Sequence, residues 1–266
     1  MFTYKTFNNI AADGLAVMAS KNIKDVSDNP DGLMLRSHKL SAEEFGNNLS
    51  AIARAGAGVN NVPIEDATDL GVVVFNTPGA NANAVKELVI CGMLLSSRGI
   101  LDGINFAKNL DSNDSDIVNQ MLEAQKKTFA GNELAGKTLG IVGLGAIGSM
   151  LAQASQALGM KLVGYDPHIS IDSAWRLPRE VEKAETLEDL LKKSDYVSLH
   201  VPLVEATKNL INADNLKYFK LGSRLINLSR GGIVNSNDVI QALENGKLSK
   251  FVTDFPTPEL IARSTK

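Results

Sequence analysis

A glycine-rich turn at residues 143–148 has the spacing G-x-G-x-x-G. The apolar run 139–142 leads into this turn, and a pattern with helical spacing follows it. A second apolar run, 161–165, ends at Asp166, which lies 18 residues after Gly148. A strand, a glycine turn, a helix and a second strand with a carboxylate at its end are typical of a unit that binds a dinucleotide.

Each glycine of this turn has its own physical task. Gly143 permits the tight turn, Gly145 lets a pyrophosphate approach the backbone, and Gly148 lets the helix pack closely on the strand. The helix then begins near Ala146 and Ile147, where unpaired N–H groups and the positive end of the helix dipole favour phosphate. We therefore expect these five residues to bind the cofactor.

Asp166 indicates which dinucleotide is expected. Its carboxylate can accept hydrogen bonds from both hydroxyls of a ribose, and it would repel a 2′-phosphate. The alternative is a tight turn between a strand and a helix, with Asp166 facing solvent and no ligand. The complete context of strand, turn, helix and strand favours binding, so the sequence predicts NAD rather than NADP as the cofactor.

The rest of the chain alternates between short apolar runs and segments with helical spacing. The clearest runs are 32–35, 71–75, 139–142, 161–165, 196–199 and 224–227. Runs this short, with little alternation, are typical of strands buried on both faces, which predicts an α/β fold with parallel sheets. Helical spacing is present at 41–50 and 187–193, and residues 83–108 read as one long helix. We interpret residues 1–97 as a first domain and residues 98–266 as a second, with the long helix as the crossover.

Composition excludes several classes of protein. Among 266 residues, 27 Lys and Arg against 30 Asp and Glu give a net charge of −3, which leaves no electrostatic reason to bind nucleic acid or an anionic membrane. The longest apolar stretch, 88–95, is far below the about 20 residues that span a bilayer, and the N-terminus has no secretory pattern. The single cysteine, Cys91, can form neither an intrachain disulfide nor a thiolate metal cluster, and its helical context predicts burial. We expect a soluble cytoplasmic protein without a metal.

Five segments resemble motifs of the D-isomer-specific 2-hydroxyacid dehydrogenases, in the order and spacing of that family. They are 54–62 (RAGAGVNNV), 76–88 (NTPGANANAVKEL), 199–203 (LHVPL), 227–234 (NLSRGGIV) and 253–255 (TDF). The resemblance covers essentially the whole chain. It implies two lobes, a flavodoxin-like substrate domain and a Rossmann NAD-binding domain, and a homodimer or higher homo-oligomer formed through the crossover region.

The resemblance and the residue chemistry together indicate a catalytic set. Arg230 follows a strand in a glycine-rich turn, and its guanidinium can hold a substrate carboxylate through two hydrogen bonds. Glu259 matches the glutamate that pairs with the catalytic histidine of the family, although it can also be an ordinary exposed glutamate. Asp254 matches the residue that bonds the nicotinamide carboxamide; the alternative is a cap at a strand end.

The resemblance also assigns residues that surround the cofactor and the substrate. At the cofactor it implies Thr77, His200, Val201, Pro202, Leu228, Ser229 and Arg230. At the substrate it implies Arg36, Ser37 and Asn81 for phosphate and hydroxyl groups, and the backbone N–H groups of Ala57 and Gly58 for the carboxylate. The alternative for the substrate set is a glycine-bearing turn without a ligand.

Within the family, the resemblance favours oxidation of D-3-phosphoglycerate to 3-phosphohydroxypyruvate with NAD, the first step of L-serine biosynthesis. The alternatives are a dehydrogenase of another D-2-hydroxy acid and a catalytically impaired NAD-binding protein. The family's P-H-L-G-A-S-T segment is expected after Glu259, but only seven residues follow it, so we expect a truncated member without that histidine. Of His38, His168 and His200, none has the glutamate pairing that the motif supplies.

Overall fold

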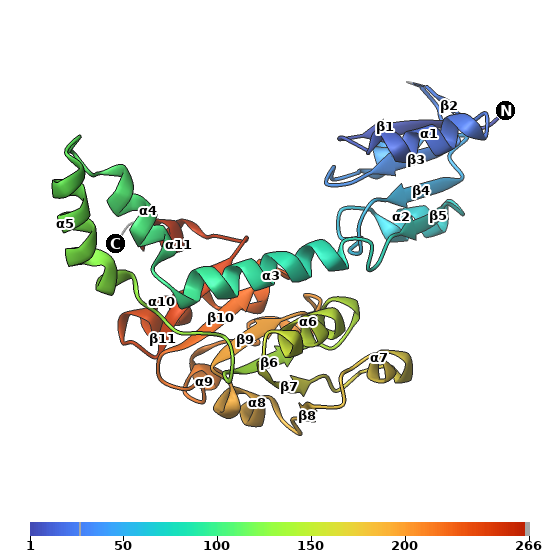
Figure 1. The fold of residues 1–266 in the computed structure, drawn as a ribbon. Helices are drawn as coiled ribbons and strands as arrows, with labels where there is room; N and C mark the ends of the chain where they lie inside the picture. The colour runs from blue at the N-terminus through green and yellow to red at the C-terminus, as the bar shows by residue number, and fades with distance from the viewer. Residues whose placement is uncertain (27, 264–266) are drawn as a thin grey trace. The chain divides into compact units, whose positions relative to one another are not determined.

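The computed structural model describes residues 1–26 and 28–263, and the chain forms two compact units, Met1–Asn81 and Ala82–Lys266 (Figure 1). Each unit is built on a parallel sheet, which confirms the expected α/β fold. The boundary expected at residue 97 falls at the end of helix α3 (Ala82–Ser97). The whole of α3 belongs to the second unit, because Val89 and Met93 are fully buried in that unit's core.

The first unit has five strands, and every neighbouring pair is parallel. The order β2-β1-β3-β4-β5 is that of flavodoxin-like folds, as expected. Leu33, Leu35 and Ile52 form the centre of its core. Its elements are β1 (Thr3–Phe7), α1 (Ala12–Ser20), β2 (Lys24–Asp25), β3 (Gly32–Leu35), η1 (Ala42–Glu44), β4 (Ala51–Arg54), α2 (Ile64–Asp69) and β5 (Val73–Asn76).

The second unit has six parallel strands in the order β11-β10-β9-β6-β7-β8. Read from β8, this is the 3-2-1-4-5-6 order of a Rossmann fold, in which ligands bind at the carboxyl ends of the strands. Its strands are β6 (Thr138–Val142), β7 (Lys161–Tyr165), β8 (Val181–Lys183), β9 (Tyr196–Leu199), β10 (Ser223–Asn227) and β11 (Leu248–Thr253). Besides α3, its helices are α4 (Ile100–Lys108), α5 (Ser115–Gln125), η2 (Lys126–Phe129), α6 (Ala146–Ala157), α7 (Ile171–Trp175), α8 (Leu187–Lys193), η3 (Glu205–Thr207), α9 (Ala213–Leu216), η4 (Gly231–Ile233), α10 (Ser236–Glu244) and α11 (Pro258–Arg263).

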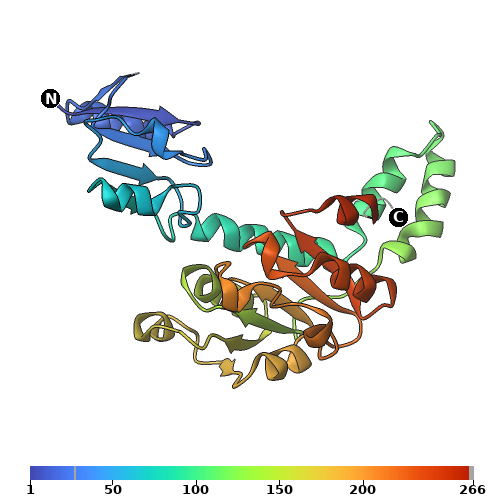
Figure 2. The same ribbon diagram turned by 180° about the vertical axis from the view of Figure 1, so that it is seen from behind.

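Two apolar clusters hold this second sheet between layers of helices (Figure 2). One cluster joins α3 and α6 to the sheet through Met93, Leu151 and Ile141. The other joins α8 and α10 through Leu190 and Val239. Both faces are therefore covered, which explains why the strands read as continuous apolar runs.

Polar contacts fix the C-terminal end of α3 on the sheet. The hydroxyls of Ser97 and Tyr196 share a buried hydrogen bond of 2.7 Å. Arg224 donates from Nε to the carbonyl of Ser96 at 2.9 Å, and its guanidinium lies 4.9 Å from the centre of the Tyr196 ring. These contacts place the end of α3 beside the first residues of β9 and β10.

Helices α4 and α5 form an arm, residues 98–131, that extends away from the second sheet (Figure 1). The two ends of the arm meet, because Gly99 donates its N–H to the carbonyl of Phe129 at 3.2 Å and Asn132 donates to Ser97 at 3.0 Å. The prediction of one helix over 83–108 is therefore wrong, since this pairing interrupts the helix at Arg98 and Gly99. None of the described helices is long and apolar enough to cross a membrane.

Two further local predictions differ from the structure. Residues 41–50 form only the short η1, because the backbone turns to the extended conformation at Phe45, with φ −77° and ψ 119°. Cys91 is exposed on α3, whose buried side instead carries Val89, Gly92 and Met93. By contrast, α8 and the central strands lie within one or two residues of their expected positions.

Candidate cofactor and active site

The glycine turn between β6 and α6 has a shape that larger residues would disturb at two positions. Gly143 has a φ of 92°, and a Cβ there would lie 2.6 Å from the carbonyl oxygen of His200. A Cβ on Gly148 would lie 2.1 Å from the carbonyl oxygen of Gly143. The first and third glycines therefore maintain packing of backbone against backbone.

The second glycine is different, because it faces open space. A Cβ on Gly145 would meet nothing within 4 Å. Gly145 is the N-cap of α6 and has no side chain that could accept the first amides of the helix. Gly145 and Ala146 are exposed, and Ile147 is half-buried. This cradle fits a diphosphate, whose oxygens can accept the free N–H groups at the positive end of the helix dipole.

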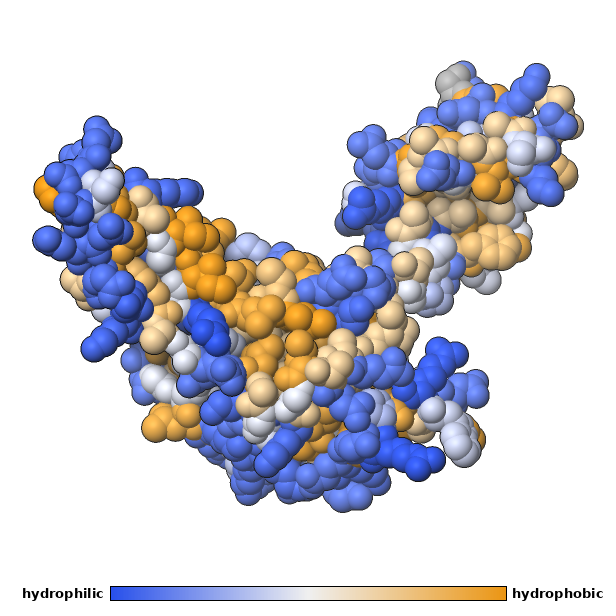
Figure 3. Space-filling model, viewed as in Figure 1, coloured by the Kyte–Doolittle hydropathy of each residue, from blue (hydrophilic) through white to orange (hydrophobic). Residues whose placement is uncertain are grey.

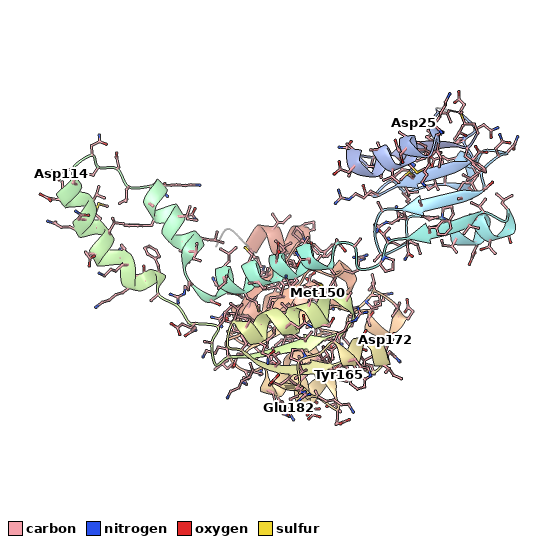
Figure 4. The ribbon with its side chains drawn as sticks, turned by 45° about the vertical axis from the view of Figure 1, so that its right-hand side comes forward. Asp25, Asp114, Met150, Tyr165, Asp172 and Glu182 are labelled. Carbon is pink, nitrogen blue, oxygen red and sulfur yellow. The ribbon has the colours of Figure 1, made fainter. Side chains whose placement is uncertain are left out.

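Asp166 lies directly after Tyr165, the last residue of β7, which Figure 4 labels together with Asp172 of α7. Its Oδ2 accepts the backbone N–H of Leu144 at 2.8 Å, and its Oδ1 accepts the N–H of His168 at 2.9 Å. A carboxylate oxygen has two acceptor positions, so both oxygens can still accept ribose hydroxyls. The carboxylate is therefore fixed beside the glycine turn and fits the ribose of NAD.

His200 follows β9 and is half-buried, with both ring nitrogens turned toward protein atoms. Its backbone N–H donates to Val142 at 2.7 Å, and its Nε2 shares a hydrogen bond of 2.9 Å with the hydroxyl of Ser198. Its Nδ1 is buried without a hydrogen-bond partner among the described residues. Burial lowers the pKa of His200 to about 4. A neutral imidazole turned toward protein atoms is poorly suited to donate a proton to a substrate at neutral pH.

The turn after β10 carries Arg230. The side chain of Asn227, which is 1% exposed, accepts the N–H of Ser229 at 3.2 Å and donates to the carbonyl of Arg230 at 2.8 Å. Ser229 donates its hydroxyl to the carbonyl of Leu199 at 2.6 Å. Arg230 donates from Nη1 to the carbonyl of Ser229, and no carboxylate among the described residues forms an ion pair with it. Its guanidinium therefore has donors left for a ligand.

Asp254 and Glu259 are exposed residues beyond the end of β11. Glu259 lies in the first turn of α11. Its own backbone N–H and the hydroxyl of Thr257 hold the pKa of its carboxyl below the usual value. Neither acidic residue has a hydrogen bond to a histidine in the described part of the chain, so their expected roles stay predictions.

The residues expected at the substrate gather at the carboxyl edge of the first sheet. Asn8, with a φ of 66°, accepts the N–H groups of Ser37 and His38 at 3.0 and 2.6 Å. The carbonyl of Arg36 accepts Nε of Arg54 and Nδ2 of Asn61 at 3.1 and 3.2 Å. The Arg36 side chain is exposed at the end of β3.

The neighbouring loops of the first unit continue this edge. The carbonyl of Ala57 accepts Nδ2 of Asn76 at 2.7 Å, and Thr77 donates its N–H to the carbonyl of Gly56 at 3.0 Å. Gly58 is half-buried beside Ala57, and Asn81 is exposed at the end of the unit. The expected substrate residues and Thr77 thus belong to the first unit, and the remaining expected residues belong to the second.

Four hydrogen bonds connect the expected cofactor residues along the edge of the second sheet. Ser229 bonds Leu199, the N–H of His200 bonds Val142, the N–H of Gly143 bonds Tyr165 at 2.9 Å, and Leu144 bonds Asp166. Val201, Pro202 and Leu228 belong to the same two turns, after β9 and β10. Sequence reasoning missed Asn227, although it is the first residue of the quoted motif 227–234. It also missed Asn8, whose only signal was a turn-forming residue after a segment not recognised as a strand.

Residues 103–266 match the family model described as D-isomer specific 2-hydroxyacid dehydrogenase, NAD binding domain. The chain belongs to this family. It is 34% identical to a D-3-phosphoglycerate dehydrogenase from Synechocystis sp. over 250 residues, which cover 93% of this chain and 42% of the relative. It is 37% identical to a hydroxypyruvate reductase from Thermotoga maritima, with 86% of this chain and 72% of the relative covered.

A solved structure of the same architecture supports the assignment of the fold. The holo form of D-mandelate dehydrogenase from Rhodotorula graminis superposes with a TM-score of 0.79 at 25% identity, covering 98% of this chain and 85% of that one. Residues 103–266, which lie in the second unit, therefore correspond to the NAD-binding domain of this family. The chain spans about two fifths of the length of the phosphoglycerate dehydrogenases that it matches (42%).

Proposed function

We propose that this protein is an NAD-dependent dehydrogenase of D-2-hydroxy acids and that D-3-phosphoglycerate is its substrate, in the first step of L-serine biosynthesis. One observation carries the proposal: the open cradle at Gly145 and the guanidinium of Arg230 both lie at the carboxyl edge of the second sheet. A site that binds NAD beside a free guanidinium suits a substrate with a carboxylate next to the reacting carbon.

The chemistry divides among residues of this chain. Bound NAD supplies the acceptor for the hydride that leaves the hydroxyl-bearing carbon. Arg230 binds the substrate carboxylate and stabilises charge on the developing carbonyl oxygen. Asp254 orients the nicotinamide through its carboxamide. The hydroxyl proton needs a histidine base paired with Glu259, and residues 260–266 contain no histidine. The structure leaves both acidic side chains exposed and accessible for these roles.

We assign substrate binding to the first unit. Its carboxyl edge carries the basic side chains Arg36 and Arg54, the hydroxyl of Ser37 and the backbone N–H groups near Gly58. Cations and hydroxyls of this kind suit a phosphate, and backbone N–H groups suit a carboxylate. The preference for a phosphorylated acid rests on this composition and on the names of the relatives in Synechocystis sp. and Bacillus subtilis.

A second candidate substrate is an unphosphorylated acid such as hydroxypyruvate or glycerate. The observation that favours it is the identity of 37% to the hydroxypyruvate reductase, a relative of which the chain covers 72%. Both substrates share a carboxylate beside the reacting carbon, so Arg230 serves either one. The difference between them lies in the contacts made by the first unit.

We also propose that two copies associate through the α4–α5 arm. No residue of α4 or α5 is buried, although both helices carry large apolar side chains. These are Ile100, Leu101, Ile104, Ile117, Met121 and Leu122, each at least 39% exposed. Figure 3 shows apolar residues, drawn in orange, around α11 on the same side of the unit. Covering apolar surface of this extent is a usual reason for association.

The experiment that tests the function uses the single tryptophan, Trp175, which lies on α7 and is 84% exposed. NADH added to the purified chain should quench Trp175 emission and produce energy transfer to the nicotinamide. Turnover is then followed with phosphohydroxypyruvate, hydroxypyruvate and pyruvate. Absence of NADH binding would remove the proposal, and equal turnover of phosphorylated and unphosphorylated substrates would remove phosphoglycerate as the preferred substrate.

A further inference from the structure

We infer that Asn227 is a positioning residue, which acts on the substrate through Arg230. The inference rests on the proposed function in one respect, because it takes Arg230 as the residue that binds the carboxylate. Asn227 is the last residue of β10, and its register partners are Leu199 of β9 and Thr253 of β11. Its backbone therefore lies between two neighbouring strands at the carboxyl edge.

Both the oxygen and the nitrogen of the Asn227 side-chain amide form hydrogen bonds with the backbone of the next turn. Oδ1 accepts the N–H of Ser229, and Nδ2 donates to the carbonyl of Arg230. An amide is suited to this pair of contacts, because it offers a donor and an acceptor in one plane. The side chain is 1% exposed, so water cannot replace a lost contact easily.

The backbone after Arg230 is fixed as well. Ile233 is fully buried, and Asn209 donates its N–H to the carbonyl of Gly232 at 2.9 Å. A Cβ on Gly231 would lie 3.3 Å from Phe255, and one on Gly232 would lie 3.2 Å from Leu203. Packing holds the backbone that follows Arg230. The orientation of Arg230 therefore depends on the contact that precedes it in the turn, which Asn227 supplies.

The guanidinium itself has little to hold it. Among the described residues, its hydrogen bond runs from Nη1 to the carbonyl of Ser229, which lies in the same turn. The backbone dihedrals of Arg230 limit which rotamers its side chain can adopt, and the acceptor of its guanidinium, the Ser229 carbonyl, moves with the same turn. A rotation of the peptide that Asn227 holds would move the guanidinium away from the carboxylate position and leave the glycine cradle at 143–148 unchanged.

The test compares Asn227→Asp with a matched control, Asn235→Asp. The first substitution keeps the acceptor for Ser229 and replaces the donor to Arg230 with an oxygen. Asn235 instead caps α10 through Oδ1, which accepts the N–H groups of Asn237 and Asp238, so its substitution makes the same chemical change away from Arg230. Arg230→Lys shows how much oxalate affinity is lost when the guanidinium is absent.

The measurements are NADH affinity, and oxalate affinity of the NADH-loaded protein. For Asn227→Asp we expect oxalate affinity reduced about tenfold, the effect of one hydrogen bond of about 1.4 kcal/mol. The loss of NADH affinity should be smaller, because the glycine cradle is unchanged and only the turn at Leu228, Ser229 and Arg230 is loosened. Asn235→Asp should change neither value. If Arg230→Lys loses oxalate and Asn227→Asp retains it, the inference is overturned while the proposed function stands.

A measurement without ligand separates the positioning role of Asn227 from the binding role of Arg230. Amide hydrogen exchange at Ile233 and Val234, which donate to the carbonyls of Arg230 and Gly231, should be faster in Asn227→Asp than in Asn235→Asp, because the first change loosens this turn. If the unmodified chain binds NADH but not oxalate, the role of Arg230 in the proposed function is wrong, and the exchange rates still test the hold of Asn227 on the turn. Equal exchange rates in the two variants would overturn the inference by themselves.

Discussion

The carboxylate of Asp166 accepts the backbone N–H of Leu144 at 2.8 Å. The residue expected to bind the ribose of NAD therefore also holds the second residue of the glycine turn. Substitution of Asp166 removes two functions at once, one toward the ligand and one toward the loop. A substitution of Asp166 therefore tests the ribose contact and the hold on the turn together.

Asp166→Ala should weaken NADH binding at least tenfold and bring the affinities for NADH and NADPH within a few-fold of each other. The first effect follows from lost ribose contacts and a looser turn, and the second from removal of the charge that repels a 2′-phosphate. Asp172→Ala, on exposed α7, makes the same change in net charge and should leave both affinities unchanged. Tighter binding of NADPH than NADH by the unmodified chain would contradict this account.

Two glycine substitutions should have opposite effects on stability and binding. Gly148→Ala places a Cβ against the carbonyl oxygen of Gly143 and should destabilise the chain by about 1–3 kcal/mol. Gly145→Ala adds its Cβ in open space, so the melting temperature should be preserved while NADH binding falls strongly. Thermal unfolding and NADH titration of both variants check the pair. Normal NADH binding by Gly145→Ala would show that phosphate does not approach the backbone at this residue.

His200 should make stability depend on pH below neutrality. An unfolded histidine has a pKa of about 6.5, whereas burial lowers the pKa of His200 to about 4 in the folded chain. Between these values the unfolded state binds a proton that the folded state does not, so stability falls as pH falls. The full difference corresponds to about 3 kcal/mol.

Urea unfolding between pH 4 and pH 7 measures this effect. His200→Gln should flatten the dependence, whereas His168→Gln, which changes an exposed histidine, should preserve it. Parallel slopes for the two variants would mean that the imidazole of His200 is open to water. A large loss of turnover in His200→Gln with unchanged NADH affinity would instead assign it a chemical role.

The buried hydroxyl pair at the end of α3 should show strong coupling. Ser97→Ala leaves the buried Tyr196 hydroxyl without this partner and should cost about 1–2 kcal/mol, whereas Tyr196→Phe should cost less, because the Ser97 hydroxyl still donates to the carbonyl of Met93 at 2.5 Å. The double variant leaves neither hydroxyl unpaired, so its destabilisation should be smaller than the sum of the destabilisations of the two single variants. A double-mutant cycle by denaturant unfolding gives the coupling. Strict additivity would show that the hydrogen bond contributes nothing.

Much of the Rossmann unit is predictable from the sequence, because its signals are local. The glycine spacing at 143–148 and the carboxylate of Asp166 lie within one βαβ unit, where chain order fixes their proximity. The break after α3 was not predictable, since it depends on Gly99 pairing with Phe129, 30 residues later in the chain. Strand β1 was missed because its sequence TYKTF mixes polar and apolar residues. Cys91 shows that helical spacing identifies an apolar stripe but not which edge of it a neighbouring helix covers.

The meeting of the two ends of the α4–α5 arm has a consequence for how this chain can change. Because Gly99, Phe129, Ser97 and Asn132 are hydrogen bonded at its base, the arm leaves the body of the unit and returns to the same place. Its length and sequence are therefore decoupled from the path that joins α3 to β6. The arm is an exchangeable module: it can be shortened, lengthened or transplanted between related chains, and the surface it presents can diverge while the nucleotide-binding unit stays the same.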